Sequence, residues 1–213
     1  MDTHAHVERG RYRLTENVTY KHLDKDGNVK PLFAINKIGR AILDAARLNY
    51  NPYDAQGRVK NELRAQLALY GLRVPFLTGR WVNEMQISNL ITTAGKAGAA
   101  SRLNGAGSEA AFTYIAVGLG TTGANIADTT LESEITDSGL ARASATASRV
   151  TTDTTNDTAQ LVLTYSVTGT KAVTESGVLN AGAAGVLLCR QTFSAINVVN
   201  LDSLQITWKI DVD

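Results

Sequence analysis

The sequence contains one cysteine, three prolines and few aromatic residues, and it lacks any long apolar run. Because Cys189 stands alone, an intrachain disulfide and a zinc site built on several thiolates are excluded. No stretch approaches the roughly 20 apolar residues that a membrane-spanning helix needs. The opening residues, MDTHAHVERGRYR, carry charges of both signs without a following apolar run, so we expect no secretory signal. The 44% hydrophobic and 19% charged fractions are those of an ordinary globular protein.

The charges are distributed unevenly, although the formal net charge is only +1. Residues 1–103 contain 16 Lys and Arg against 9 Asp and Glu, a net charge of +7, whereas residues 104–213 contain 5 and 11, a net charge of −6. Such asymmetry suits head-to-tail packing of identical subunits or docking of a basic segment on an acidic protein. Nucleic acid is the less favoured partner, because the basic residues form no stripe and are barely interleaved with aromatic residues.

Residues 1–36 are predicted to form an extended arm that carries a β-hairpin. Two short strands in NVTYKHLDKDGNVKPLF flank a D-K-D-G turn at 24–27, and Pro31 confines the second strand to a sheet edge. The acidic residues of this turn also resemble the start of a calcium-binding loop. We reject that interpretation, because Val29 stands where such a loop needs glycine and Ile35 where it needs a bidentate glutamate.

Residues 37–103 show apolar residues at helical spacing and are predicted to form short amphipathic helices. Breaks are expected at the Asn-Pro-Tyr-Asp run at 51–54 and at the stretch 73–79. A capping box of Asn83 and Gln86 would begin the third helix. The small-residue run TTAGKAGAASRLNGAG that follows fits a tight packing surface and a fraying helix end equally well. The three apolar stripes are Ile38, Ile42, Ala45 and Leu48; Leu63, Leu67 and Tyr70; and Met85, Ile87, Leu90 and Ile91.

After Ala110 and to the end of the sequence, apolar residues recur at every second position, which is the pattern of strands buried on one side. SLQITWKIDV at 203–212 alternates without a fault. Several short strands separated by Gly, Asn, Asp and Thr turns are typical of an antiparallel sandwich. The predicted fold is therefore α+β but mainly β, with an extended N-terminal arm, short helices and a jelly-roll-like antiparallel β-sandwich at 104–213. The expected strands lie at 112–117, 141–150, 161–167, 172–180, 186–193, 196–199 and 203–212.

Two patterns in the C-terminal half resemble catalytic motifs. GLGTTG at 118–123 matches the glycine spacing of a dinucleotide-binding turn and follows a predicted strand. The polar segment after it lacks the apolar helix that a Rossmann unit requires, so we favour a glycine-rich loop leaving a strand. Glu132, Glu134 and Asp137 could supply a carboxylate pair for hydrolysis, but no second cluster supports them, and a solvated loop face is the preferred interpretation.

The remaining candidate residues point to structural roles. His4, His6 and His22 form no triad with any Ser, Cys or acid, and we expect them to be solvated. A metal bound by the first two at an oligomer axis is the less favoured alternative. Trp208 and Cys189 are expected in the core of their strands. We therefore predict a non-enzymatic protein with no catalytic residue, no metal, no cofactor and no small-molecule substrate.

Three stretches of the C-terminal half occur together and in order: FTYIAVGLGTTGANIADTTLESEI at 112–135, AVTESGVLNAGAAGVLLCRQTFSAINV at 172–198 and DSLQITWKI at 202–210. Their combination resembles a β-rich module that recurs in structural proteins of tailed bacteriophages. The D-K-D-G hairpin ahead of a helix also resembles the N-terminal part of those proteins. Residues 34–82 depart from the pattern and look like an insertion.

The resemblance implies a virion component that is assembled in the host cytoplasm as a homo-oligomer and contacts the major capsid protein or tail proteins, with no membrane partner. Capsid decoration is the first choice, with the basic arm lying across coat subunits. A tail, neck or fibre-base component is the second, and a receptor-binding module using the loops at 119–139 and 152–158 is the third. Arg and aromatic side chains on extended segments are the usual anchors of such contacts. The predicted inter-subunit contacts are Arg9, Arg11, Arg13, Tyr20, Phe33 and Trp81.

Overall fold

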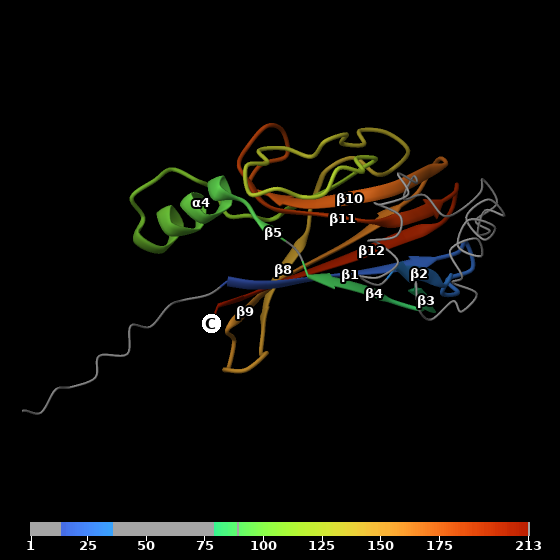
Figure 1. Cartoon of the computed structure of the whole chain (residues 1–213), viewed down its shortest axis with the longest axis horizontal. Coiled ribbons are helices and arrows are strands. Elements are labelled where there is room, and N and C mark those ends of the chain that lie inside the picture. Colours follow the sequence, from blue (N-terminus) through green and yellow to red (C-terminus); the bar gives the residue numbers. More distant parts are fainter. Residues whose placement is uncertain (1–13, 36–78, 89, 213) are drawn as a thin grey trace, which may run out of the picture.

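The computed structural model describes residues 14–35, 79–88 and 90–212, which form a β-sandwich of two antiparallel sheets (Figure 1). The predicted class, mainly β with an antiparallel sandwich, is confirmed. The first sheet has the order β4 (Met85–Ser88), β1 (Leu14–Leu23), β12 (Ser203–Val212), β9 (Thr158–Ser166) and β8 (Thr146–Val150). The second has the order β5 (Leu90–Ile91), β11 (Leu187–Val198), β10 (Lys171–Leu179), β6 (Tyr114–Gly118) and β7 (Ala143–Ser144). A small sheet pairs β2 (Leu32–Ile35) with β3 (Gly79–Val82), and helix α4 spans Thr93–Asn104.

The first sheet is buried on one face only. On its central strand β12, Leu204, Ile206 and Trp208 are fully buried, while the residues between them are partly or fully exposed. Strand β1 pairs with β12 along its whole length and adds Val18 and Tyr20 to the same core. From Leu204 to Ile210 the burial follows the alternation that the period of two predicts. The last two residues differ, because Asp211 is buried and accepts from Thr158 Oγ1 at 3.0 Å, while Val212 is 48% exposed.

The second sheet is buried on both faces at its centre. Strands β10 and β11 pair antiparallel, and almost every residue from Val173 to Leu179 and from Leu187 to Val198 is buried. The strands predicted at 186–193 and 196–199 form one continuous strand, β11. No turn interrupts them, and Ser194 and Ala195, which lie between the two predicted strands, are buried within β11.

Two strand segments change sheets and thereby close the long sides of the sandwich. On one side β4 pairs with β1 in the first sheet, and β5, which follows it, pairs with β11 in the second. On the other side β7 pairs with β6 and the adjacent β8 pairs with β9. Such sheet-switching strands form the corners of a sandwich. Strands β1, β4 and β5 complete the sheets, so the sandwich begins before the predicted boundary at residue 104.

Two hydrogen bonds cross the core between the sheets. The Tyr165 hydroxyl on β9 donates to the carbonyl oxygen of Ile115 on β6 at 2.7 Å. Trp208 Nε1 on β12 donates to Ser176 Oγ on β10 at 3.2 Å. Both polar groups would otherwise be buried without a partner, so these bonds fix how the two sheets face each other.

The turn predicted at 24–27 forms, but the hairpin predicted around it does not continue. Gly27 has a φ of 82°, and the Asp24 carboxylate accepts hydrogen bonds from the backbone of the turn. After a single bridge between Leu23 and Val29, the chain leaves the first sheet, and β2 pairs with β3 instead of β1. In the first sheet β1 lies between β12 and β4, both of which come from distant parts of the chain.

The helical prediction for residues 37–103 is wrong for residues 85–91, although helix α4 occupies the last part of the range. The third predicted stripe lies in strands β4 and β5, and the helix begins only after them. Its N-cap is Thr92, whose hydroxyl accepts a hydrogen bond from Gly95 N at 2.8 Å, so the predicted capping box of Asn83 and Gln86 does not start a helix. The stripes at 38–48 and 63–70 lie outside the described residues.

Helix α4 uses its small residues to pack closely on β11. A Cβ placed on Gly95 would lie 2.1 Å from the carbonyl oxygen of Leu188, and one on Gly98 would lie 2.7 Å from the ring of Phe112. The small-residue run therefore forms a tight packing surface, the first of the two predicted alternatives. Within the described ranges, no helix combines the length and the apolar character needed to cross a membrane.

Candidate functional site

The outer face of the second sheet is covered by a loop of residues 119–139, drawn in yellow-green to yellow above β10 in Figure 1. Leu131 of the loop is buried and packs with Leu179 of β10 and Leu187 of β11 in a hydrophobic cluster separate from the main core. This cluster lies on the side of the sheet that faces away from the sandwich interior. The loop is therefore an additional layer of the fold.

The carboxylate of Glu175 on β10 lies fully buried where the loop meets the sheet. Its Oε1 atom accepts hydrogen bonds from Gly120 N at 3.0 Å and Ser133 N at 2.7 Å. Its Oε2 atom accepts from Glu132 N at 3.0 Å and from Arg190 Nε at 2.8 Å. One buried side chain thus holds the loop at residue 120 near its start and at residues 132–133 farther along, and its charge is balanced by the guanidinium of Arg190.

The Arg190 guanidinium on β11 connects three carboxylates of this region. Besides Glu175, it donates to Asp128 Oδ2 at 2.8 Å, to the carbonyl oxygen of Thr122 at 3.1 Å and to Glu132 Oε2 at 3.3 Å. Burial lowers the pKa of Arg190, but pairing with Glu175 and Asp128 outweighs that effect and raises it. The side chain is therefore a permanent cation. Its bonds to Asp128, Thr122 and Glu132 hold the loop against the sheet at three positions.

The glycines of GLGTTG make room for this carboxylate. A Cβ on Gly118 would lie 2.3 Å from Glu175 Oε1, and one on Gly120 would lie 2.5 Å from the same atom. Gly123 has nothing within 4 Å of a Cβ. The favoured interpretation of the motif, a glycine-rich loop leaving a strand, agrees with β6 ending at Gly118. The first two glycines allow the loop backbone to approach a protein carboxylate.

The three acidic residues singled out in the sequence contact different partners. Glu134 accepts from Arg142 Nε at 2.9 Å, and Asp137 lies 2.8 Å from Lys171 Nζ. Glu132 accepts from the backbone and hydroxyl of Thr122, and these bonds lower its pKa. Lys171 likewise lowers the pKa of Asp137. All three side chains are engaged in holding the loop.

His22 on β1 is buried, so the expectation that it is solvated is wrong. Its Nε2 atom lies 2.7 Å from Asp202 Oδ2, which also accepts from Lys30 Nζ and Val199 N at 2.9 Å each. Burial lowers the pKa of His22, and the hydrogen bond with Asp202 offsets this only in part. Burial raises the pKa of Asp202, but the bonds from Val199, Lys30 and His22 outweigh it and lower the pKa overall. The cluster ties β1 to the turn between β11 and β12.

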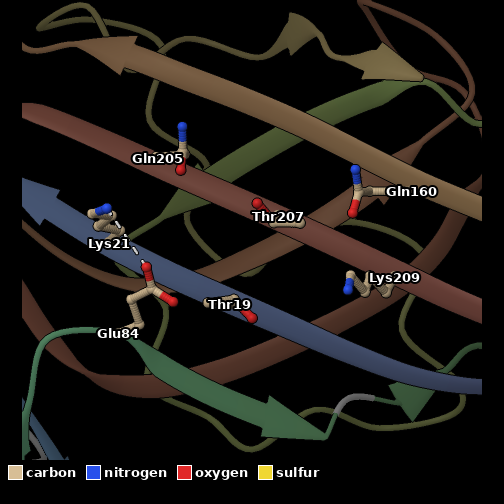
Figure 2. A pocket seen from close by; sticks show the side chains of 7 residues that line it. All are labelled: Thr19, Lys21, Glu84, Gln160, Gln205, Thr207 and Lys209. Atoms are coloured by element: carbon tan, nitrogen blue, oxygen red, sulfur yellow. Dashed lines mark ion pairs between the residues drawn. The ribbon is translucent and has the colours of Figure 1, made fainter. Parts of the chain in front are cut away.

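The outer face of the first sheet carries no covering layer in the described ranges and is polar. A shallow hollow of about 220 Å³ lies across β1, β12 and β9, with Glu84, the residue before β4, at its edge. Figure 2 shows the side chains that line it. Lys21 Nζ and Glu84 Oε1 lie 3.6 Å apart on its rim. Hydroxyl and amide groups on a flat sheet suit contact with a broad polar surface. The lining residues are Thr19, Lys21, Glu84, Gln160, Gln205, Thr207 and Lys209.

The predicted contact residues that the structure describes lie in different environments. Tyr20 is fully buried, and its ring lies 4.1 Å from that of Phe193, centroid to centroid, so its assignment as an exposed contact is wrong. Strand β1 lies inside a five-stranded sheet and directs Tyr20 into the core. Phe33 is half-buried, and its backbone pairs with that of Trp81 in the small sheet. Arg9, Arg11 and Arg13 lie outside the described residues, as do His4 and His6.

Sequence reasoning missed Glu175, Arg190 and Asp202. A signal was present for the first two, because each interrupts an otherwise apolar strand sequence, AVTESGVL and VLLCRQTF. A charge in such a run indicates a buried partner of opposite sign. Asp202 gave no comparable signal, since an acidic residue after Asn200 reads as an ordinary turn. Its partner His22 lies 180 residues earlier in the chain.

Among the residues that the structure describes, no group of three or more His, Cys, Asp or Glu side chains is placed to hold a metal ion. The polar clusters instead join the loop, the turns and the strands to one another. Comparisons of the chain with protein-family models, with curated proteins and with solved structures give no match.

Proposed function

We propose that the protein is a non-enzymatic structural component of a tailed-phage virion, and specifically a capsid decoration protein. One observation carries the proposal. The sequence stretches that resemble phage structural modules supply the residues that hold the sandwich and its covering loop together. Gly120 comes from the stretch at 112–135, and Glu175 and Arg190 come from the stretch at 172–198. The three residues meet in one buried cluster.

Glu175 and Ser176, which are neighbours in the stretch at 172–198, act on opposite faces of the second sheet. Glu175 points outward and holds the loop of residues 119–139, whereas Ser176 points inward and accepts the hydrogen bond from Trp208. Asp202, the first residue of the stretch at 202–210, binds His22 of β1. The resembling residues thus depend on one another physically, which supports treating them as the signature of one module.

The charged groups favour a binding role over a catalytic one. In the loop of residues 119–139, Asp128, Glu132 and Glu134 each accept hydrogen bonds from Arg190 or Arg142. Fixed ion pairs of this kind preorganise a surface, while a catalytic group needs access to substrate and a pKa matched to its task. The flat polar face of the first sheet adds a second surface that suits protein contact.

Decoration of a capsid accounts for the basic N-terminal residues as well. Strand β1 begins at Leu14, so Arg9, Arg11 and Arg13 immediately precede the sandwich in the sequence. An arm that is ordered on binding gains contact area at an entropic cost and can lie across neighbouring coat subunits. The sandwich would then stand on the outer surface of the particle.

The decisive experiment is the copy number of the protein in purified virions of the phage that encodes it. Quantitative mass spectrometry would compare its peptides with those of the coat protein. A ratio of the order of one per coat subunit or per capsomer, retained on tailless heads, is the expected result. A handful of copies that are lost with the tail would instead place the protein at the neck, tail or fibre base. Absence from virions would overturn the proposal.

A truncation tests the arm separately. Removing residues 1–12 leaves β1 intact, whereas a longer deletion would remove a strand that pairs with β12. We expect the truncated chain to keep its melting temperature and to lose at least about tenfold in particle incorporation, the effect of removing anchor contacts. Unchanged incorporation would show that the arm makes no essential contact.

A further inference from the structure

The turn between β11 and β12 presents apolar side chains to solvent. Leu201 is 63% exposed, and Val199 is 37% exposed. The turn that precedes β2 adds Val29, which is 36% exposed and is followed by Lys30, a partner of Asp202. Scattered exposed apolar residues are common on proteins, so exposure alone does not mark a site. The backbone of this turn supplies the second observation.

Leu201 adopts a backbone conformation that leucine disfavours. Its φ is 72°, at the third position of a turn closed by a hydrogen bond from Asp202 N to the carbonyl oxygen of Val199 at 3.0 Å. Glycine or asparagine is the usual residue there, because a larger side chain crowds the backbone when φ is positive. A leucine at this position strains the turn while leaving most of its own surface in water, so the fold of this chain gains little from it.

The turn is also held rigidly. Leu201 N donates to the carbonyl oxygen of Val167 at 2.8 Å, and Val167 N donates to that of Asp202 at 2.9 Å. The buried Asp202 carboxylate accepts from Val199 N and from the side chains of His22 and Lys30. A side chain on such a support loses little conformational freedom when it binds, which is the property of a preorganised anchor.

We infer that Leu201 is an anchor that inserts into an apolar hollow of the coat layer. The inference rests on the proposed function and names one contact through which the protein binds the particle. The occupant follows from the size of the patch. Its three apolar side chains present far less surface than the roughly 800 Å² that each partner buries in a standard interface. Such a patch cannot form a stable dimer of two copies by itself. The size of the patch fits the apolar centre of a larger interface, with other contacts around it.

The test combines binding and stability. Purified wild-type chain, Leu201→Asn and the control Leu103→Asn are added to particles assembled without the protein, and bound copies are counted by mass spectrometry. Leu103 is 89% exposed on helix α4 and has no left-handed backbone, so it matches Leu201 in type but not in role. We expect Leu201→Asn to melt at the same or a higher temperature and to bind at least about tenfold more weakly. The control should bind like the wild type.

Binding of Leu201→Asn at the wild-type level would overturn the anchor while leaving the proposed function intact. Failure of the wild-type chain to bind particles would overturn the proposed function and, with it, this occupant. A photo-crosslinking residue at position 201 identifies the partner directly. An adduct with a coat subunit supports the inference, whereas an adduct with a second copy or with residues 36–78 of the same chain, or no adduct on decorated particles, overturns it.

Discussion

Strands β11 and β12 follow each other in the chain but lie in opposite environments. From Ser203 to Ile210 of β12, buried residues alternate with partly or fully exposed ones, whereas β11 is buried at nearly every position. The difference arises outside both strands, because the loop of residues 119–139 covers the second sheet and nothing in the described ranges covers the first. A strand's sequence pattern therefore reports how many of its faces are buried.

The same contrast explains where charges are placed. On the covered sheet, Glu175 and Arg190 are tolerated because each satisfies the other and the loop backbone. On the open sheet, Lys209 faces solvent and needs no such partner. Burying an unpaired charge is costly, while a solvated charge contributes little. The two faces should consequently respond very differently to substitution.

The largest effect is expected from Glu175→Ala. The change leaves Arg190 with an incomplete set of partners and the amides of Gly120 and Ser133 without an acceptor, so the free energy of unfolding should fall by about 3–5 kcal/mol. Urea denaturation measures the loss, and hydrogen exchange of the two amides reports opening of the loop. The control Asp137→Ala breaks an exposed pair and should lower the free energy of unfolding far less. Equal losses in both variants would contradict a special role for the buried pair.

A smaller effect is expected from filling the space around the carboxylate. Gly120→Ala places a Cβ 2.5 Å from Glu175 Oε1 and should cost about 1–3 kcal/mol by overpacking. Gly123→Ala, in the same motif, meets nothing within 4 Å and should change stability by less than about 0.5 kcal/mol. Thermal or urea unfolding distinguishes the two. The prediction fails if both alanines are tolerated equally.

The His22 cluster should make stability depend on pH. The pKa of His22 is lowered in the folded state, so the unfolded chain binds more protons and stability falls as the pH drops below about 6.5. The slope for this one group cannot exceed about 1.4 kcal/mol per pH unit. Asp202, whose pKa is also lowered, adds a further loss below pH about 4. Urea midpoints at pH 7.5, 6.5 and 5.5 should shift more in the wild type than in His22→Gln. Equal shifts in the two proteins would show that His22 is not the source of the pH dependence.

The smallest effects are expected on the open face. Lys209→Ser and Glu84→Gln should each change the free energy of unfolding by less than about 0.5 kcal/mol, because both side chains are solvated and the Lys21 pair is exposed. Thermal unfolding in low and high salt checks this. A loss above about 1 kcal/mol in either variant would show that this face is packed in the isolated chain.

The sequence predicts best the strands that keep one face in solvent. Residues 203–212 alternate without a fault, and the strand has those limits. The sequence predicts worst where tertiary contacts outweigh local preference. Met85, Ile87, Leu90 and Ile91 fit a helical stripe, yet pairing with β1 and β11 places them in two short strands. The sequence places Tyr20 on an exposed arm. The strands that pair with β1 lie at residues 85–88 and 203–212, too far along the chain for a local pattern to reveal them.

The candidate site follows the same division. The glycines at 118–123 and the charges within apolar strands are visible in the sequence, but their convergence on one carboxylate is not. Contacts across 55 residues, as between Gly120 and Glu175, and across 180 residues, as between His22 and Asp202, carry no local pattern. The strain at Leu201 was equally hidden, since an asparagine directly before it reads as the natural residue for a left-handed turn.

The sequence by itself determined that this chain is mainly β, that its last strand is buried on one side and that the glycine motif is a loop. These follow from the period of the apolar residues and from local turn chemistry, which act over a few residues. Only the tertiary structure decided which strands are neighbours, which face is covered and which charges are buried. Those depend on long-range pairing, because the free energy of burying a charge or an apolar face is set by what packs against it.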